Sequence, residues 1–201
     1  MKIYQLICKL VFILVFISCK SYAGELSPQK NLVTLGSDEA PVKIKIFSSL
    51  TCPHCADFHT KVLPSIKEKY VKSGKVQIIF VDFPLDKAGF NASKLLHCLN
   101  KKKQMNFLDE IYENQNQWTS GSDLNEINEN LKKIVSDLGI STSRFEECLN
   151  NETISDKILN GRIDAQEKYS INSTPTIIIN EKKLKGSASF KNIEKNIKKI
   201  I

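Results

Sequence analysis

The chain has 201 residues, of which 41% are hydrophobic and 25% charged, and its formal net charge is +7. These values are typical of one soluble globular domain, and they argue against a disordered chain or a multi-span membrane protein. The lysine-rich segments 101–103 and 191–199 contain no interleaved aromatic residues for base stacking. We interpret them as solvated helix faces, so nucleic-acid binding is not expected.

Residues 1–23 have the features of a cleaved signal peptide. A basic start is followed by an apolar run at 10–17, which is too short to span a membrane, and then by Ser-Tyr-Ala at 21–23. We expect cleavage after residue 23 and release of residues 24–201 into the periplasm as a thioredoxin-like domain. This removes three lysines and no acid, leaving a formal charge of +4. Lipidation at Cys19 is the alternative processing route.

Four cysteines remain after the predicted cleavage: Cys52, Cys55, Cys98 and Cys148. An even number of cysteines in an exported chain indicates an oxidising compartment, where disulfides persist.

The first pair of these cysteines lies where a predicted strand meets a predicted helix. Residues 42–47 alternate between apolar and polar side chains, which is typical of a strand. The motif Cys52-Pro53-His54-Cys55 follows, and beyond it apolar residues recur every four positions, at Phe58, Val62 and Ile66. This spacing predicts a helix that begins at the motif and that Pro64 kinks or divides.

The rest of the pattern predicts an α/β fold with a helical insertion. Residues 76–83 form a second strand, which completes a βαβ unit. Helices are then expected near 88–99, 105–112, 124–138, 143–149 and 154–169, followed by strands at 176–179 and 183–185 and a closing helix at 190–200. Ser143 and Glu146 have the spacing of a capping box for the fourth of these helices. The helical insertion therefore covers about residues 86–170.

The position of the motif predicts redox chemistry. Unpaired N–H groups and the helix dipole stabilise a thiolate at a helix N-terminus. We expect Cys52 to be the exposed nucleophile and Cys55, one turn in, to be the buried resolving thiol. The His54 ring can donate to the thiolate. A lowered pKa makes Cys52 a good leaving group, so its disulfide is easily passed to a substrate.

Three segments resemble the DsbA-like thiol:disulfide oxidoreductases. They are Ile46-Phe47-Ser48-Ser49-Leu50-Thr51-Cys52-Pro53-His54-Cys55, Asp82-Phe83-Pro84-Leu85 and Ser173-Thr174-Pro175-Thr176. The resemblance extends from Leu32 to the end of the chain. It implies a thioredoxin fold with an inserted α-helical domain. It also implies that Pro175 is a cis-proline facing the cysteines, and that Thr174 and Pro175 bind an extended substrate by backbone pairing.

Two positions depart from the family pattern. Members commonly carry a buried acid six positions before the first cysteine, where this chain has Ile46, so a proton relay to the buried thiol must use water or another group. Thr174 stands where strongly oxidising members often have valine and isomerases often have threonine. Only about 18 residues separate the predicted cleavage site from the first strong strand. That length is too short for the dimerisation domain of the known isomerases, which argues against an isomerase. We expect a monomer.

A metal site and free thiols are the structural alternatives for the cysteines. Cys52, Cys55 and His59 could bind zinc or copper, but a zinc site usually has four ligands and no second Cys-x-x-Cys exists. We therefore expect no metal and no organic cofactor, with His59 near the rim of the site. We expect Cys98 and Cys148 to form a structural disulfide, the alternative being two buried free thiols.

Together these features predict a periplasmic enzyme that donates the Cys52–Cys55 disulfide to unfolded, newly exported polypeptides through a mixed disulfide at Cys52. By resemblance, a DsbB-type membrane partner reoxidises it. The alternatives are a disulfide isomerase or reductase, or a metal-binding assembly factor that uses the same thiols.

Overall fold

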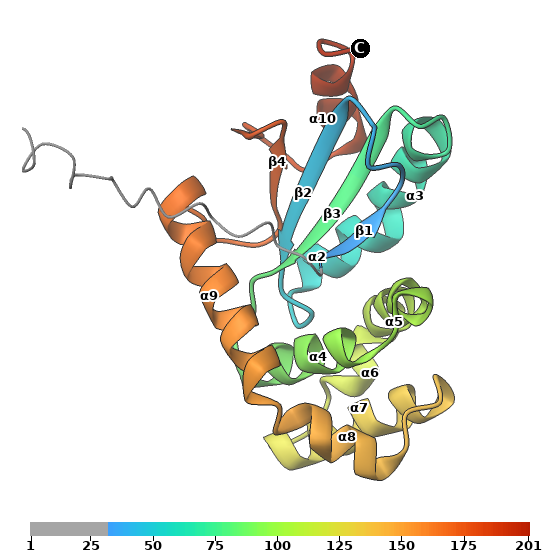
Figure 1. Cartoon of the computed structure of the whole chain (residues 1–201), viewed down its shortest axis with the longest axis vertical. Coiled ribbons are helices and arrows are strands. Elements are labelled where there is room, and N and C mark those ends of the chain that lie inside the picture. The colour runs from blue at the N-terminus through green and yellow to red at the C-terminus, as the bar shows by residue number, and fades with distance from the viewer. Residues whose placement is uncertain (1–31) are drawn as a thin grey trace, which may run out of the picture. The chain divides into compact units, whose positions relative to one another are not determined.

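A five-stranded mixed sheet lies at the centre of the computed structural model, which describes residues 32–201 (Figure 1). The predicted signal peptide and Cys19 lie outside the described residues. The strands are β1 (Val33–Leu35), β2 (Val42–Ser48), β3 (Val76–Asp82), β4 (Thr176–Ile179) and β5 (Lys182–Lys183), in the order β1-β3-β2-β4-β5. Only β2 and β3 are parallel. The strands predicted at 42–47, 76–83 and 176–179 are confirmed, whereas the one predicted at 183–185 is shifted, because β5 ends at Lys183. The strand β1 has three residues and too little alternation to be predicted.

The helical stretch that joins β2 to β3 begins at the cysteine motif. It consists of α2 (Pro53–Asp57), the π-helical segment η1 (Phe58–Val62), α3 (Leu63–Ile66) and the π-helical segment η2 (Lys67–Val71). Pro64 lies in the first turn of α3. Proline has no N–H to donate and is tolerated in a first turn. Helical residues continue without a break from Pro53 to Val71, so Pro64 does not divide the helix but lies where the π-helical segment η1 gives way to α3.

The predicted helical insertion is confirmed between β3 and β4. It contains α4 (Lys87–Cys98), α5 (Lys101–Glu113), α6 (Gln115–Trp118), α7 (Leu124–Asp137), α8 (Thr142–Leu149) and α9 (Glu152–Tyr169). The predicted capping box of α8 is wrong, because α8 begins two residues earlier. Ser141 is the N-cap, and its hydroxyl accepts from the Arg144 N–H.

The closing helix is α10 (Phe190–Ile197). Within residues 32–201, no helix is long and apolar enough to cross a membrane.

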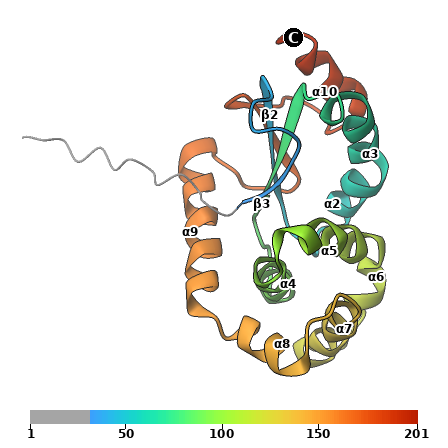
Figure 2. The same cartoon turned by 45° about the vertical axis from the view of Figure 1, so that its right-hand side comes forward.

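Side-chain alternation along the strands divides the core between the two faces of the sheet. Ile44 and Ile46 of β2 point to one face, where α3 and α10 cover them, while Phe47 points to the other, where α9 lies. Figure 2 shows these helices on opposite sides of the sheet. The carboxyl end of β2 lies near the helical insertion, and α2 begins at this end of the strand.

A disulfide between Cys98 and Cys148 links α4 to α8, as predicted. Their Cα atoms are 5.9 Å apart, within the range that a disulfide bridges. Trp118 is 1% exposed, and its indole N–H donates to the carbonyl oxygen of Ile111, 2.9 Å away. The insertion therefore shares one buried core with the sheet, since Trp118 belongs to the same cluster as Ile44 and Ile46, and the disulfide adds a covalent link within it.

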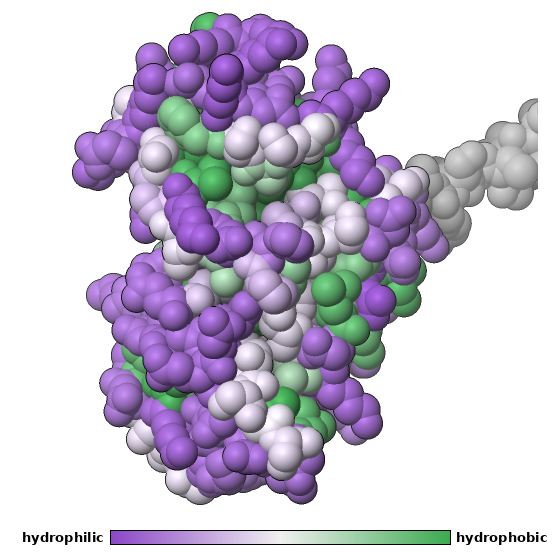
Figure 3. Space-filling view, turned by 180° about the vertical axis from the view of Figure 1, so that it is seen from behind, coloured by the Kyte–Doolittle hydropathy of each residue, from purple (hydrophilic) through white to green (hydrophobic). Residues whose placement is uncertain are grey.

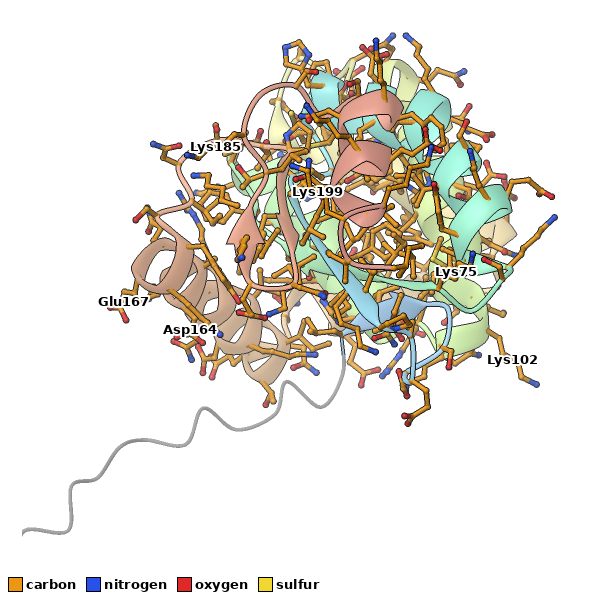
Figure 4. The ribbon with its side chains drawn as sticks, turned by 90° about the horizontal axis from the view of Figure 1, so that it is seen from above. Lys75, Lys102, Asp164, Glu167, Lys185 and Lys199 are labelled. Carbon is orange, nitrogen blue, oxygen red and sulfur yellow. A yellow bond between two sulfur atoms is a disulfide. The ribbon has the colours of Figure 1, made fainter. Side chains whose placement is uncertain are left out.

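Charged groups are distributed around the described surface. Figure 4 shows Lys75, Lys102 and Lys185 extending outward from different parts of the molecule, while Asp164 and Glu167 extend from α9. The face in Figure 3 is mainly hydrophilic, with apolar residues in separate patches. Basic and acidic side chains thus extend from several different elements of the described chain.

Candidate active site

Cys52 is the N-cap of α2, and Cys55 lies one turn inside the helix. The Cys52 backbone is extended, with φ −81° and ψ 118°. Its carbonyl oxygen accepts hydrogen bonds from the N–H groups of Cys55 and Ala56 at 3.0 and 3.1 Å. Pro53 occupies the first helical position, where its missing N–H costs nothing. The strand-to-helix turn predicted from the sequence is confirmed.

The Cys52 sulfur lies against the loop that precedes β4. The peptide bond between Thr174 and Pro175 is cis, as the resemblance implied. Cys52 Sγ lies 3.4 Å from the Thr174 carbonyl oxygen. Because this loop covers the sulfur, Cys52 is only 7% exposed, and the expected exposure of this side chain is wrong. Cys55 is 2% exposed, which confirms its expected burial.

The two thiols have opposite acidities. A hydrogen bond from the Cys55 thiol, with further N–H groups of His54 and Cys55, lowers the pKa of Cys52 from the ordinary 9.0 to about 5, against the opposing effect of burial. The hydrogen bond to Cys52, burial and the negative charge on Cys52 raise the pKa of Cys55. At neutral pH the reduced site therefore holds one thiolate, at Cys52, and one thiol, at Cys55.

The backbone before the cysteines is fixed by side chains at the start of α4. Thr51 Oγ1 donates to Asp86 Oδ2 at 2.8 Å, and Ser49 Oγ lies 2.9 Å from Thr51 Oγ1. Asp86 also caps α4 through the Gly89 N–H. A Cβ atom at Gly89 would come within 2.8 Å of Ser49 Oγ, so glycine permits this close approach.

Gln115, in the short helix α6, holds the loop from the other side. Its side-chain amide donates to the carbonyl oxygens of Leu50 and Cys52 at 2.7 and 3.1 Å. Gln115 is 5% exposed although its neighbours in the polar segment 114–117 are largely accessible. Sequence reasoning missed this residue. Trp118, three positions further on, was the available signal, because residues three apart in a helix lie on the same face and a buried tryptophan marks that face as buried.

His54 and His59 differ in their surroundings. The His54 side chain is exposed beside Cys52, and its N–H belongs to the first turn of α2. His59 is 6% exposed and thus buried rather than at the rim, with its Nε2 atom 2.6 Å from Asp109 Oδ1. Among residues 32–201, no group of three His, Cys, Asp or Glu side chains is arranged to hold a metal ion. Cys52, Cys55 and His59, named above as an alternative metal site, are not such a group.

A Cys-x-x-Cys pair at a helix N-terminus, with a low-pKa first cysteine facing a cis-proline loop, defines a thiol:disulfide oxidoreductase with the thioredoxin fold. A family model described as Thioredoxin matches residues 29–199. The chain belongs to the thioredoxin family and, within it, to the DsbA-like oxidoreductases.

Three relatives illustrate this membership. The crystal structure of alpha-DsbA1 from Wolbachia pipientis is 33% identical, covers 87% of this chain and 93% of that chain, and has a TM-score of 0.77. The oxidised BdbD structure from Bacillus subtilis is 25% identical over 86% of this chain and 94% of that one, with a TM-score of 0.72. A probable disulfide bond formation protein D from Bacillus cereus is 29% identical over 80% of this chain and 76% of its own length.

Proposed function

We propose that this enzyme is a periplasmic dithiol oxidase that donates its Cys52–Cys55 disulfide to newly exported, unfolded polypeptides. The observation that supports this direction of transfer is the lowered pKa of Cys52, about 5. A stabilised thiolate stabilises the reduced form of the enzyme, and an enzyme with a stable reduced form gives its disulfide away readily.

The transfer follows from the acidities of the two sulfurs. A substrate thiolate attacks Cys52 Sγ, the Cys52–Cys55 bond breaks, and Cys55 leaves with the electron pair and takes up a proton. A second substrate thiolate then attacks the substrate sulfur of the mixed disulfide and releases Cys52 as a thiolate. The substrate loses two electrons and the enzyme gains two. Cys52 is a good leaving group in this second step because its pKa is low.

Substrate binding is proposed at the cis-proline loop. Thr174 and Pro175 lie beside the reacting sulfur, where an extended peptide can pair with the loop backbone as a strand pairs with a sheet edge. Leu85 is 50% exposed, and its N–H donates to Ser49 Oγ in the loop that precedes Cys52. An apolar side chain at this position suits unfolded chains, which expose hydrophobic residues.

Export and the redox partner complete the proposal. The signal-like residues 1–23 support a periplasmic location, and the even set of remaining cysteines suits an oxidising compartment. The likeness to DsbA-type structures supports a DsbB-type membrane protein as the oxidant that regenerates the disulfide. The enzyme is proposed to act as a monomer.

The test is the redox equilibrium of the purified protein in a series of glutathione buffers, read by alkylation and mass measurement. We expect the Cys52–Cys55 pair to remain reduced until the buffer is far more oxidising than the cytosolic glutathione pool. A Cys98→Ser/Cys148→Ser double variant is the control, because its only thiols among the described residues are those of the active site.

A strongly reducing equilibrium would instead identify a reductase. Rapid recovery of activity from a scrambled-disulfide substrate, without added oxidant, would favour the isomerase that Thr174 suggests by resemblance.

A further inference from the structure

Exchange at the Cys52–Cys55 pair requires a proton to reach and leave Cys55 in every cycle. Cys55 accepts a proton when it leaves the disulfide, and it must lose one before it can attack a mixed disulfide at Cys52. Cys55 is 2% exposed, and its surroundings favour the thiol. Bulk water therefore has poor access to this sulfur, and another group must carry the proton.

A small cavity adjoins Cys55 and is lined in part by Pro175 of the cis-proline loop. It has a volume of about 10 Å³, close to the smallest space that holds one water molecule. The polar side chains among its lining residues are Ser48, His59 and Tyr112; the others are Ile46, Cys55, Phe58, Phe80 and Pro175. His59 follows Cys55 by four residues, so both side chains lie on the same face of the helix.

His59 also connects this cavity with solvent. Its Nε2 atom is 2.6 Å from Asp109 Oδ1, and the Asp109 side chain is 42% exposed while that of His59 is 6% exposed. A carboxylate at this position favours the tautomer in which Nε2–H donates to Asp109 and Nδ1 keeps a lone pair. The imidazole is held further by the Tyr112 ring, 4.7 Å away between centroids, and by the Phe80 ring at 6.1 Å.

We propose that His59 exchanges the proton of Cys55 through the small cavity and passes it to solvent at Asp109. In the attacking direction, the Cys55 proton moves to His59, the Cys55 thiolate attacks Cys52 Sγ, and the partner sulfur leaves with the bonding electrons. In the donating direction, protonated His59 returns the proton to the departing Cys55 thiolate. The inference rests on thiol-disulfide exchange at this pair, in either direction of net transfer.

The charges around His59 suit this task. Burial lowers the pKa of His59, while the nearby carboxylates of Asp109 and Glu113 on α5 raise it and Lys67 of η2 lowers it, with a net downward shift. The imidazole is therefore neutral at neutral pH and able to accept a proton. The Asp109 carboxylate stabilises the transient imidazolium form of His59. The proton can therefore move in either direction between His59 and Cys55.

The other two polar residues that line the cavity, Tyr112 and Ser48, cannot exchange a proton with Cys55 near neutral pH. Burial and the charge of Cys55 raise the pKa of Tyr112 well above its ordinary value, so its hydroxyl cannot serve as an exchangeable base. A serine hydroxyl such as Ser48 does not titrate near neutral pH. Among the side chains that line this cavity, His59 alone titrates in the useful range.

The experiment separates the two chemical steps on the full enzyme. Reduced protein is mixed with oxidised glutathione, quenched with acid at intervals, and analysed by mass for reduced, glutathionylated and oxidised forms. The first step, attack by the Cys52 thiolate, forms the glutathione adduct. The second step, attack by Cys55, removes it and requires loss of the Cys55 proton.

The main variant is His59→Gln, whose side-chain amide can still donate to Asp109 but cannot accept a proton near neutral pH. We expect an unchanged first step and a second step slower by about tenfold or more at pH 7, with the adduct accumulating. The slowing should diminish as the pH rises and hydroxide replaces the missing base. Asp109→Asn, which keeps the shape and a hydrogen bond but removes the charge, should slow the second step by less.

His97→Gln is the matched control. The His97 side chain is also 6% exposed and pairs with a carboxylate, Asp82, at 2.6 Å, but His97 does not line the Cys55 cavity. The proposal predicts a normal second step in this variant. If His59→Gln also slows the first step, its fold is damaged and Asp109→Asn decides the question.

The outcomes are distinct. A second step with the wild-type rate and pH profile in both the His59→Gln and Asp109→Asn variants, or one slowed equally by His97→Gln, would overturn the assignment of His59. Failure of the wild-type pair to form a disulfide would instead overturn the proposed oxidoreductase function. A change in the equilibrium constant without a change in the second-step rate would show a structural role only.

Discussion

Cys52 and Cys55 are three positions apart, yet the fold gives their thiols opposite acidities. The N-cap position exposes Cys52 to the N–H groups of the first turn and to the Cys55 thiol, while Cys55 itself is buried behind it. The sequence predicted this asymmetry, because only the first cysteine of such a motif can occupy the N-cap.

The first prediction concerns the alkylation of Cys52. The rate of reaction of the reduced protein with iodoacetamide should follow the fraction of Cys52 thiolate, with a midpoint at pH about 5. Cys55 should remain unmodified throughout, because it is buried and protonated. The Cys55→Ser variant lacks the thiol that donates to Cys52, so its midpoint should move to higher pH. A wild-type midpoint near 9 would contradict the stabilised thiolate.

Other residue-scale features could not be predicted, because they depend on contacts between distant segments. The burial of Cys52 requires the Thr174–Pro175 loop, 122 residues along the chain, to lie against its sulfur. His59 had helical spacing from Cys55, but its pairing with Asp109 depends on how α5 lies beside η1. Periodicity shows which face a residue occupies and not which element covers that face.

At the scale of elements, α6 supports the active-site loop although it has only four residues. We predict that Gln115→Leu destabilises the protein by about 1–3 kcal/mol, since it leaves the buried Leu50 carbonyl without its side-chain donor. The exchange rate should fall as well, because the same amide donates to the Cys52 carbonyl. Urea unfolding measures the first effect. Gln117→Leu, at an exposed position of the same helix, should change the free energy of unfolding little.

The disulfide between α4 and α8 acts within the insertion and away from the redox site. It closes a loop with a sequence separation of 50 residues. Replacing both Cys98 and Cys148 with serine should lower the free energy of unfolding by about 2–5 kcal/mol, measured by urea denaturation of the oxidised protein. The glutathione equilibrium of the active-site pair should stay the same. A large change in that equilibrium would show that the insertion tunes the redox site through this link.

Elements with strong periodicity were predictable, and short ones were not. Residues 124–138 repeat apolar positions over several turns, and α7 (Leu124–Asp137) follows them closely. The strand β1 has three residues, which give too few alternations to identify it, and it pairs with the distant β3. The start of α8 was misplaced because Ser141 and Ser143 both suit an N-cap, and only tertiary context selects between them.

At the scale of the whole molecule, the thioredoxin fold and the insertion contribute different parts of the active site. The sheet with α2 supplies the low-pKa sulfur, and the cis-proline loop before β4 lies against it. The insertion contributes the side chains that fix the site from outside the sheet, through Asp86, Gln115 and Asp109. The insertion therefore helps to hold the site in place, although sequence reasoning placed the whole site in the thioredoxin core.

The final prediction links the redox state of the enzyme to its stability. Because the folded state lowers the pKa of Cys52 from 9.0 to about 5, the thiolate stabilises the reduced enzyme fully above pH 9, and this contribution is lost as the pH falls through 5. The oxidised enzyme has no Cys52 thiolate and lacks this contribution. The free energy of unfolding of the reduced form, minus that of the oxidised form, should therefore increase between pH 5 and pH 8.

Urea denaturation of both forms at the two pH values measures this difference, and subtraction cancels the other titrating groups, which both forms share. Cys55 contributes little in this range, because it stays protonated in the folded state and is largely protonated in the unfolded state below pH 9. In the Cys52→Ser variant, the stability measured under reducing conditions should lose the part of its pH dependence that the thiolate causes. A difference between the two wild-type forms that is independent of pH would mean that the thiolate does not supply the driving force for disulfide donation.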